Sequence, residues 1–254
     1  MLLALDVGNS NIVFGIFKKN NLILKSRIHT DKNKSAEGYF KLFSSCFKKE
    51  KIELKSISGL IISSVVPSLN SCLEDVFKSS FKLAARFVDS SFKTNINFKI
   101  DNPGELGSDR IVNAAAAYEK IKSDVIVIDF GTATTFDCIS KEGDFLGGLI
   151  VPGIEISSNA LFAKTSKLPK VELTRPKNLI GKNTVECIQS GLINGYYSMV
   201  EGLLTRLKNE MRSNSTVIAT GGLASIVLGK KNEIMEIDEN LTLYGLKIVY
   251  ELNF

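Results

Sequence analysis

Two short segments far apart in the chain share one pattern. Residues 3–11 read LALDVGNSN and residues 125–134 read VIVIDFGTAT. In each segment an apolar run ends in Asp, and Gly follows two positions later, before small residues and a second apolar stretch. A strand, a tight turn and a returning strand form a hairpin whose backbone amides can bind phosphate beside a carboxylate. The doubled pattern therefore predicts two similar lobes that together bind a nucleotide triphosphate and its metal ion.

The composition is that of a globular protein with room for two domains. The 254 residues are 44% hydrophobic and 23% charged, which is enough to build a sizeable core. The net charge of +5 comes from scattered Lys residues, with small clusters at 32–34 and 48–51. No segment combines focused positive charge with aromatic residues, so we interpret these Lys residues as solvated surface and expect no nucleic acid partner.

No segment predicts secretion or insertion into a membrane. The chain starts on an apolar strand without a basic leader, and no apolar run approaches 18 residues. The four cysteines, Cys46, Cys72, Cys138 and Cys187, are far apart and form no CxxC pair. We interpret them as buried, reduced thiols and expect a cytoplasmic protein.

Apolar periodicity predicts strands alternating with helices in both halves of the chain. The expected strands lie at 2–6, 12–17, 22–28, 59–67, 85–89, 125–128, 134–139, 141–153 and 216–222. The expected helices lie at 36–49, 69–77, 109–117, 155–164, 184–211 and 242–252. This order and the internal duplication predict an α/β fold with two lobes facing a cleft. We place the N-terminal lobe at 1–115 and the C-terminal lobe at 116–254.

The polar residues of the two turns suit phosphate and metal binding. A Gly in each turn lets the backbone approach phosphate oxygens closely, and Asn9, Ser10, Asn11 and Thr132 offer hydrogen-bond donors. Asp6 can hold Mg2+ directly or through water, because Mg2+ takes few protein carboxylates and keeps several waters. A single DxG after a strand is more often an ordinary turn. The prediction therefore depends on the presence of two copies.

A third Gly-rich turn, TGG at 220–222, follows another predicted strand. Gly221 and Gly222 leave the backbone bare, so a flat group such as adenine can lie against it. An ordinary turn from a strand into a helix explains the same residues.

The segment NPGELGSDR at 102–110 supplies a carboxylate and a guanidinium group. Asp109 can orient and deprotonate an attacking hydroxyl, and Arg110 can bind a carboxylate through two parallel hydrogen bonds. Asp109 can equally be the N-cap of the helix that follows. The only histidine, His29, ends a strand flanked by Lys and Arg, and we interpret it as a surface residue. Chemistry by carboxylates, backbone amides and a metal favours phosphoryl transfer.

Taken in their order along the chain, these motifs resemble the type III pantothenate kinase family. The segments that carry the resemblance are DVGNSN (6–11), SSVVP (63–67), NPGELGSDR (102–110), DFGTATTFD (129–137), GGLIVPG (147–153), NT…SG (183–191), ATGGLA (219–224) and LTLYGL (241–246). They cover essentially the whole chain. The family belongs to the superfamily of acetate and sugar kinases, Hsp70 and actin. The resemblance thus implies two duplicated actin-like, ribonuclease H-like lobes around a nucleotide cleft.

The resemblance implies ATP-dependent phosphorylation of pantothenate to 4′-phosphopantothenate, the first step of coenzyme A biosynthesis. Asp109 would accept the proton of the pantothenate hydroxyl, Asp129 would help bind the K+ or NH4+ that the family requires, and Thr132 would contact ATP. The first phosphate loop for ATP would comprise Asp6, Val7, Gly8, Asn9, Ser10, Asn11, Ile12 and Val13. The pantothenate contacts would be Gly107, Ser108, Asp109, Arg110 and Thr184. The family supplies the matching threonine across a homodimer interface.

Two positions depart from the family pattern. Ser10 stands where the family usually has Thr, and it keeps the hydroxyl. Ile100 stands where many members carry a Tyr that lines the substrate pocket, so one hydroxyl is missing there.

Two other functions remain open from the sequence. Some relatives of this family are described as accessory transcription factors, so a nucleotide-binding regulator is one alternative. A kinase for another small carboxylated alcohol is the second, because of the Ile100 departure.

Overall fold

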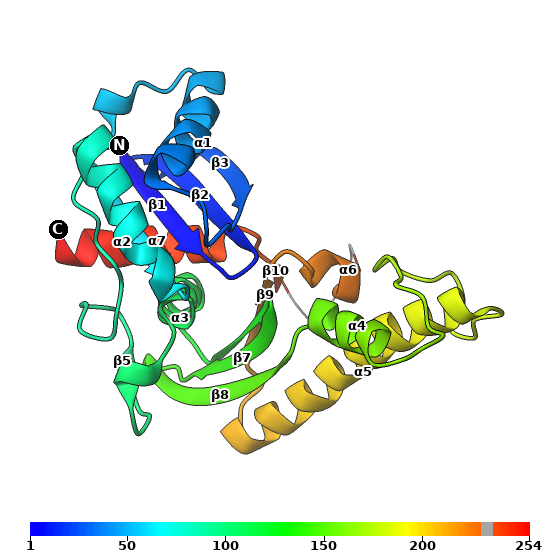
Figure 1. The fold of residues 1–254 in the computed structure, drawn as a ribbon. Coiled ribbons are helices and arrows are strands. Elements are labelled where there is room, and N and C mark those ends of the chain that lie inside the picture. Colours follow the sequence, from blue (N-terminus) through cyan, green and yellow to red (C-terminus); the bar gives the residue numbers. More distant parts are fainter. Residues whose placement is uncertain (230–235) are drawn as a thin grey trace. The chain divides into compact units, whose positions relative to one another are not determined.

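The computed structural model describes residues 1–229 and 236–254, which form two compact units. Unit 1 comprises residues 1–95, 101–116 and 240–254, and unit 2 comprises residues 96–100 and 117–239. Figure 1 shows the order of their helices and strands. The boundary that we expected after residue 115 falls inside one continuous helix, and the last residues of the chain belong to unit 1.

Unit 1 is built on a four-stranded sheet in the order β3-β2-β1-β4. Its strands are β1 (Leu2–Val7), β2 (Asn11–Lys18), β3 (Asn21–His29) and β4 (Gly59–Ser64). The first three strands are antiparallel, and β4 lies parallel to β1. Its helices are α1 (Ala36–Lys49), α2 (Pro67–Asp75), which continues into a π-helical turn (Val76–Phe81), the first part of α3 (Ser108–Ile121), and α7 (Leu241–Asn253). Two short 3-10 turns lie at Leu54–Ser56 and Pro103–Glu105.

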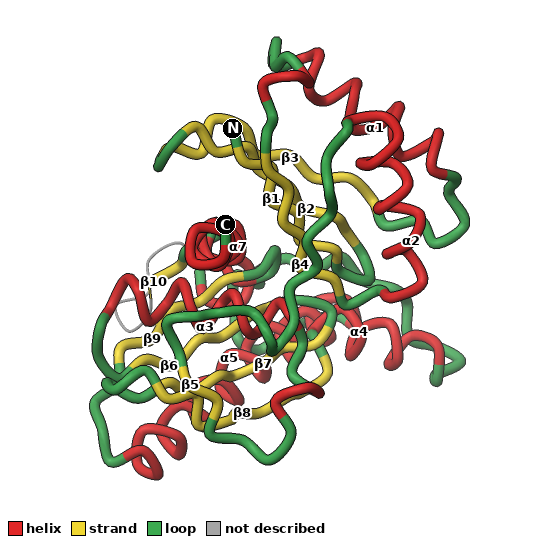
Figure 2. The backbone as a smooth tube through the Cα atoms, turned by 90° about the vertical axis from the view of Figure 1, so that its left-hand side faces the viewer, coloured by secondary structure: helices red, strands yellow, loops and turns green. Residues whose placement is uncertain are grey.

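Apolar residues from α1, α2 and one face of this sheet form the core of unit 1. Phe14 on β2 contacts the rings of Phe43 and Phe47 on α1 at centroid distances of 5.1 and 5.8 Å. Helix α7 packs against β1, β2 and β4. Figure 2 shows α1 and α2 on one side of the sheet and α7 on the other. Burial on both faces accounts for the nearly unbroken apolar runs of β1 and β4.

Helix α7 approaches its neighbours closely because of two glycines. A side chain at Gly245 would collide with the backbone of Val112 on α3, and one at Gly15 on β2 would meet Leu243 at 2.9 Å. Helix α7 belongs to unit 1, so the chain returns to unit 1 after unit 2.

Unit 2 contains a six-stranded sheet in the order β10-β9-β6-β7-β8-β5. Its strands are β5 (Asn97–Phe98), β6 (Val125–Phe130), β7 (Ala133–Ile139), β8 (Asp144–Pro152), β9 (Thr216–Thr220) and β10 (Glu236–Ile237). Its other helices are α4 (Ile154–Ala163), α5 (Thr184–Met211) and α6 (Ala224–Leu228). Helices α4, α5 and α6 share an apolar core with one face of the sheet.

The two sheets repeat one topology. Strands β1, β2 and β3 form an antiparallel meander with β4 parallel to β1, and β6, β7 and β8 form the same meander with β9 parallel to β6. The predicted duplicated α/β fold is confirmed. The turns differ by one residue, because Val7 pairs with Ile12 whereas Phe130 pairs with Thr134.

Most predicted elements are present, and one predicted strand was wrong. Helices α1 and α5 have the predicted bounds. Residues 85–89 form no strand and make only an isolated bridge between Phe87 and Ile62. Within the described residues, no helix is long and apolar enough to cross a membrane. All four cysteines are free thiols, but only Cys138 is buried, whereas Cys46 and Cys72 are half-buried and Cys187 is exposed.

Candidate active site

The first turn of the doubled pattern joins β1 to β2. Asp6 lies near the end of β1, paired with Val13 on β2 and Ser63 on β4. The Gly8 N–H donates to the Asn11 carbonyl at 3.0 Å and closes the turn. A side chain at Gly8 would lie 3.2 Å from that carbonyl oxygen, so the turn is tightly folded.

The eight residues predicted to form the ATP loop differ in their exposure to solvent. Val7 and Ile12 are fully buried in the core, so their side chains cannot contact a ligand. Asp6 and Ser10 are half-buried, and Asn9 is exposed. The polar side chains available to phosphate therefore lie at the turn itself.

The start of α3 is attached to the end of β4 through Ser108. The buried Ser108 hydroxyl accepts a hydrogen bond from the Ser64 N–H at 2.8 Å and lies 3.1 Å from the Ser63 hydroxyl. Ser63 is the β4 partner of Asp6. This connection brings the predicted base, Asp109, to the edge of the sheet at which Asp6 also lies.

Asp109 is the second residue of α3 and is half-buried. Its Oδ1 atom accepts a hydrogen bond from the Arg110 N–H at 2.8 Å. Burial raises the pKa of Asp109 above its usual value, although the hydrogen bond and the positive charge of Arg110 act in the opposite direction. A carboxylate with a raised pKa is a stronger proton acceptor, which suits a general base.

The neighbours of Asp109 leave its carboxylate little lateral room. A side chain at Gly107 would lie 2.5 Å from the Asp109 Oδ1 atom. A larger residue at position 107 would therefore crowd the carboxylate. Arg110, the residue after Asp109, is half-buried.

The second turn of the doubled pattern joins β6 to β7 in unit 2. Asp129 pairs with Thr135 on β7 and Thr220 on β9. The Gly153 N–H donates to the Thr132 carbonyl at 3.1 Å, and a side chain at Gly153 would collide with that carbonyl. The GGLIVPG segment thus packs directly on the second turn.

The third Gly-rich turn lies beside Asp129. Gly221 has a φ of +92°, and a side chain there would lie 2.6 Å from the Asp129 Oδ1 atom. The turn thus requires glycine both for its backbone conformation and for space. Gly222 is exposed next to it.

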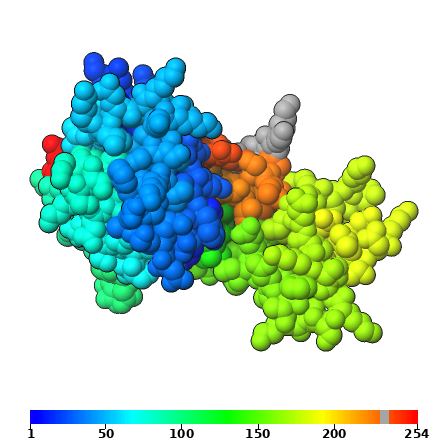
Figure 3. All heavy atoms as spheres, turned by 45° about the horizontal axis from the view of Figure 1, so that its top comes forward, coloured from blue at the N-terminus to red at the C-terminus, as the bar shows by residue number. Residues whose placement is uncertain are grey.

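Two predicted substrate residues lie elsewhere in unit 2. Thr184 is the exposed first residue of α5 and lines a groove of about 640 Å³ with Leu161, Leu168, Cys187 and other residues. The residues of α5 that pack in the core begin only at Ser190. Figure 3 shows the segment from α4 to the start of α5, in yellow-green, projecting from one end of the unit.

Ile100 follows the short strand β5 and is half-buried. A side chain at Gly147 on β8 would lie 3.8 Å from its Cγ2 atom. Ile100 therefore places an apolar side chain beside β8, at the position where the resemblance predicts a Tyr in many members.

The oxygen atoms at both turns suit the cations that the resemblance implies. No three His, Cys, Asp or Glu side chains of residues 1–229 and 236–254 gather into a metal-binding group. Mg2+ needs no such group when phosphates and waters complete its shell, so Asp6 beside the first turn suits it. A monovalent cation takes carboxylate and carbonyl oxygens, and Asp129 lies among the glycine backbones of the second and third turns.

Some residues that support these turns were not predicted from the sequence. The Tyr196 hydroxyl on α5 donates to the Pro152 carbonyl at 2.8 Å and lies 2.8 Å from the Thr134 hydroxyl oxygen. Ser63 supports the start of α3. The SSVVP motif includes Ser63, but no local pattern predicts a contact with a residue 45 positions away.

The type III pantothenate kinase family model matches residues 2–206. The chain is 47% identical over 253 residues to the type III pantothenate kinase of Citrifermentans bemidjiense, with complete coverage of both chains. It is 46% identical to the enzyme of the same description from Moorella thermoacetica, also with complete coverage. The chain belongs to the type III pantothenate kinase family. This membership confirms the resemblance found from the sequence motifs.

Solved structures show that the fold of this family member is shared more widely. A Campylobacter jejuni protein described as a Baf family transcriptional activator aligns with a TM-score of 0.59 at 19% identity, covering 98% of this chain and 97% of the other. Component A of (R)-2-hydroxyglutaryl-CoA dehydratase from Acidaminococcus fermentans aligns with a TM-score of 0.55 at 14% identity, covering 98% and 96%. At these identities the similarity shows the fold alone.

Proposed function

We propose that this chain transfers the γ-phosphoryl group of ATP to the primary hydroxyl of pantothenate, giving 4′-phosphopantothenate in coenzyme A biosynthesis. Membership of the type III pantothenate kinase family supports this reaction. The observation that carries the mechanism is Asp109, a half-buried carboxylate with a raised pKa at an anchored helix start. Family membership also favours a kinase over the nucleotide-binding regulator.

In the proposed reaction, Asp109 accepts the proton of the pantothenate hydroxyl. The hydroxyl oxygen forms a bond to the γ-phosphorus, and the bond from that phosphorus to the β,γ-bridging oxygen breaks, so that ADP leaves. The backbone amides of the first turn bind phosphate oxygens. Mg2+ held by Asp6, and K+ or NH4+ held with Asp129, would offset the negative charge of the phosphates.

The remaining residues position the two substrates. Gly107, Ser108 and Arg110 bind pantothenate, with the Arg110 guanidinium group suited to its carboxylate. Thr132 contacts ATP, and Gly221 and Gly222 present bare backbone to the adenosine. Ile100 would give the substrate pocket an apolar side chain where many family members have the hydroxyl of a Tyr. Turnover of a panel of carboxylated alcohols therefore tests whether the chain is a kinase for another substrate of that class.

We further propose a homodimer in which Thr184 of one protomer contacts the pantothenate of the other. Thr184 is exposed and lies in an apolar groove at one end of unit 2. Leu179 and Ile180 next to this groove are 72% and 81% exposed. Exposed apolar residues in one patch are typical of a surface that binds another chain.

The test is turnover of pantothenate with Mg-ATP, measured through ADP release with and without added K+ or NH4+. We expect activity that requires pantothenate and rises with either cation. ADP release that depends on neither would contradict the proposed reaction. A gel-shift assay with DNA tests the regulator, and DNA binding without kinase activity would favour it.

A further inference from the structure

Thr30, a residue that follows β3, forms two hydrogen bonds to the first turn. The Thr30 hydroxyl donates to the Gly8 carbonyl at 2.7 Å, and its N–H donates to the Ser10 carbonyl at 3.0 Å. Thr30 is 6% exposed, so water does not compete freely for these bonds. A third contact comes from the same segment, because the Lys32 Nζ atom donates to the Asn9 Oδ1 atom at 3.4 Å.

These two bonds determine which way the turn amides point. In a trans peptide the carbonyl oxygen and the following N–H point in opposite directions, and the described chain has no cis peptide bonds. Because the Gly8 and Ser10 carbonyls point toward Thr30, the N–H groups of Asn9 and Asn11 point away from it. Thr30 thus sets the direction of two amides in the loop assigned to phosphate.

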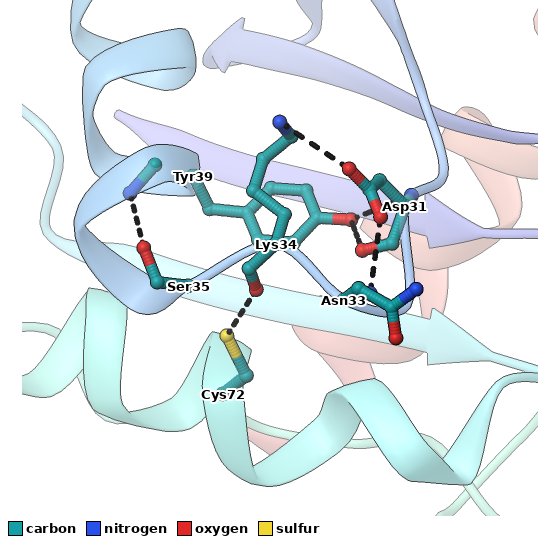
Figure 4. Close-up of polar contacts among 7 residues, drawn as sticks. Asp31, Asn33, Lys34, Ser35, Tyr39 and Cys72 are labelled. Atoms are coloured by element: carbon teal, nitrogen blue, oxygen red, sulfur yellow. Dashed lines mark hydrogen bonds and ion pairs between the residues drawn. The ribbon is translucent and has the colours of Figure 1, made fainter.

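Thr30 itself is fixed through Asp31. The Tyr39 hydroxyl donates to the Asp31 carbonyl at 2.9 Å and accepts from the Asp31 N–H at 3.0 Å. The Tyr39 ring is fully buried on α1. Figure 4 shows this arrangement, with the Lys34 Nζ atom 3.5 Å from the Asp31 carboxylate and the Asn33 N–H donating to the same carboxylate. The turn is therefore connected to the core of unit 1 through Thr30, Asp31 and Tyr39.

We propose that Thr30 is a positioning residue for ATP, which orients the amides of the first turn toward the phosphates without contacting the nucleotide. The inference rests on the proposed function only in assigning this turn to ATP. A net intramolecular hydrogen bond contributes about 0.5–1.5 kcal/mol. Removing the Thr30 hydroxyl should therefore weaken ATP binding about 3- to 10-fold and leave pantothenate binding unchanged.

The test compares Thr30→Val, which keeps the shape but loses the hydroxyl, with Thr30→Ser, which keeps the hydroxyl. The dissociation constant of the non-hydrolysable analogue AMPPNP with Mg2+ is measured by calorimetry, and KM for ATP and for pantothenate by ADP release. We expect Thr30→Val to raise the AMPPNP constant and KM for ATP together, and Thr30→Ser to restore both to within about twofold. Thr205→Val is the matched control, because that hydroxyl donates to a helix carbonyl on α5 at 3.0 Å.

A folded Thr30→Val protein with unchanged AMPPNP binding contradicts the inference, as does a Thr30→Ser protein that binds AMPPNP no better than Thr30→Val. If Thr30→Val does not fold, Tyr39→Phe decides: weaker AMPPNP binding with an unchanged pantothenate KM supports the inference, and unchanged AMPPNP binding contradicts it. A wild-type chain that binds AMPPNP but does not phosphorylate pantothenate would overturn the proposed function alone.

Discussion

Asp109 illustrates how a single residue acquires its chemistry from its surroundings. The helix start and the Arg110 N–H favour the ionised carboxylate, whereas burial favours the neutral acid. Burial is the larger effect, so the pKa is raised. The sequence left open whether Asp109 caps the helix or accepts a proton. In the structure it lies within the helix, and its Oδ1 atom accepts a hydrogen bond from the adjacent Arg110 N–H.

Asp109→Asn should abolish most turnover without unfolding the protein. The amide oxygen of Asn can still accept the Arg110 N–H, but it cannot accept a proton, so kcat should fall about 10²- to 10⁴-fold. The measurement is kcat for pantothenate together with the thermal midpoint. Asp75→Asn, at an exposed carboxylate on α2, is the control and should keep full activity. Near-wild-type kcat in Asp109→Asn would rule out Asp109 as the base.

The raised pKa of Asp109 predicts the acidic limb of the pH profile. The base is active only when ionised, so kcat/KM for pantothenate should fall as the pH drops through the pKa of Asp109 in the folded protein. That midpoint should lie above the usual Asp value of about 3.9. Because the folded-state pKa is raised, ionising Asp109 costs stability as the pH rises through it. Asp109→Asn should therefore be at least as stable as wild type at pH 8, and a clear loss of stability there would contradict this account.

Gly221→Ala should destabilise unit 2. A methyl group at φ +92° is strained and would lie 2.6 Å from the Asp129 Oδ1 atom, so we expect a cost of about 1–3 kcal/mol. Urea unfolding measures it. Gly202→Ala on the exposed face of α5, where no atom lies within 4 Å, should instead stabilise the helix by about 1 kcal/mol. Equal effects of the two substitutions would show that the Gly221 conformation is not required.

At the scale of elements, the junction between β4 and α3 connects the sheet to the proposed base. The connection depends on one buried hydroxyl, that of Ser108, which contacts Ser63 and the backbone of Ser64. The hydrogen bonds of the Ser108 hydroxyl therefore fix the position of α3 relative to the edge of the sheet at which Asp6 lies.

Ser108→Ala should loosen this junction. It leaves the Ser64 N–H without its side-chain acceptor, which costs about 1–3 kcal/mol, and kcat should fall because the neighbouring Asp109 loses its fixed position. Urea unfolding and pantothenate turnover are measured together. Ser45→Ala on the exposed face of α1 is the control, with an expected change within about 0.5 kcal/mol. Ser108→Ala with wild-type stability and kcat would show that the junction is held by other contacts.

Element boundaries were predictable where local periodicity was strong. Helix α5 keeps its pattern over 28 residues, and the bounds were correct at both ends. The prediction of a strand at 85–89 was wrong, because these apolar residues pack against the core of unit 1 without forming a ladder of β-sheet hydrogen bonds. The backbone of Ile62 bonds to Arg86 and Val88, and the pairing extends no further. Alternation of apolar residues cannot distinguish a short bridging segment from a strand.

At the scale of the whole molecule, the chain order and the units do not coincide. Helix α7 follows all of unit 2 in sequence but packs on β1 and β4 of unit 1. The fit depends on glycines at the contacts, Gly245 on α7 and Gly59 on β4, where side chains would collide with Val112 and with the Tyr250 hydroxyl. No local pattern in α7 indicates which sheet it covers.

The proposed dimer predicts the effect of a charge in the exposed apolar patch. Ile180→Asp should convert the dimer to a 27.8 kDa monomer, because a carboxylate is costly to bury at an interface. It should also raise KM for pantothenate, since Thr184 would no longer reach the partner's substrate. Sedimentation velocity and kinetics measure the two effects. Leu252→Asp, at a 44% exposed residue of α7, is the control and should stay dimeric. A monomeric wild-type protein with full activity would contradict the shared site.

The sequence alone determined the duplicated turns and the α/β alternation, because turn chemistry and apolar periodicity are local properties of the chain. The resemblance of its ordered motifs indicated the family. The sequence also singled out Asp109 and the glycines of the turns. Only the tertiary structure showed that Thr30 holds the first turn and that Ser108 is bound to β4, since both contacts join residues more than 20 positions apart. The tertiary structure also decided the raised pKa of Asp109, because burial depends on segments that meet only when the chain has folded.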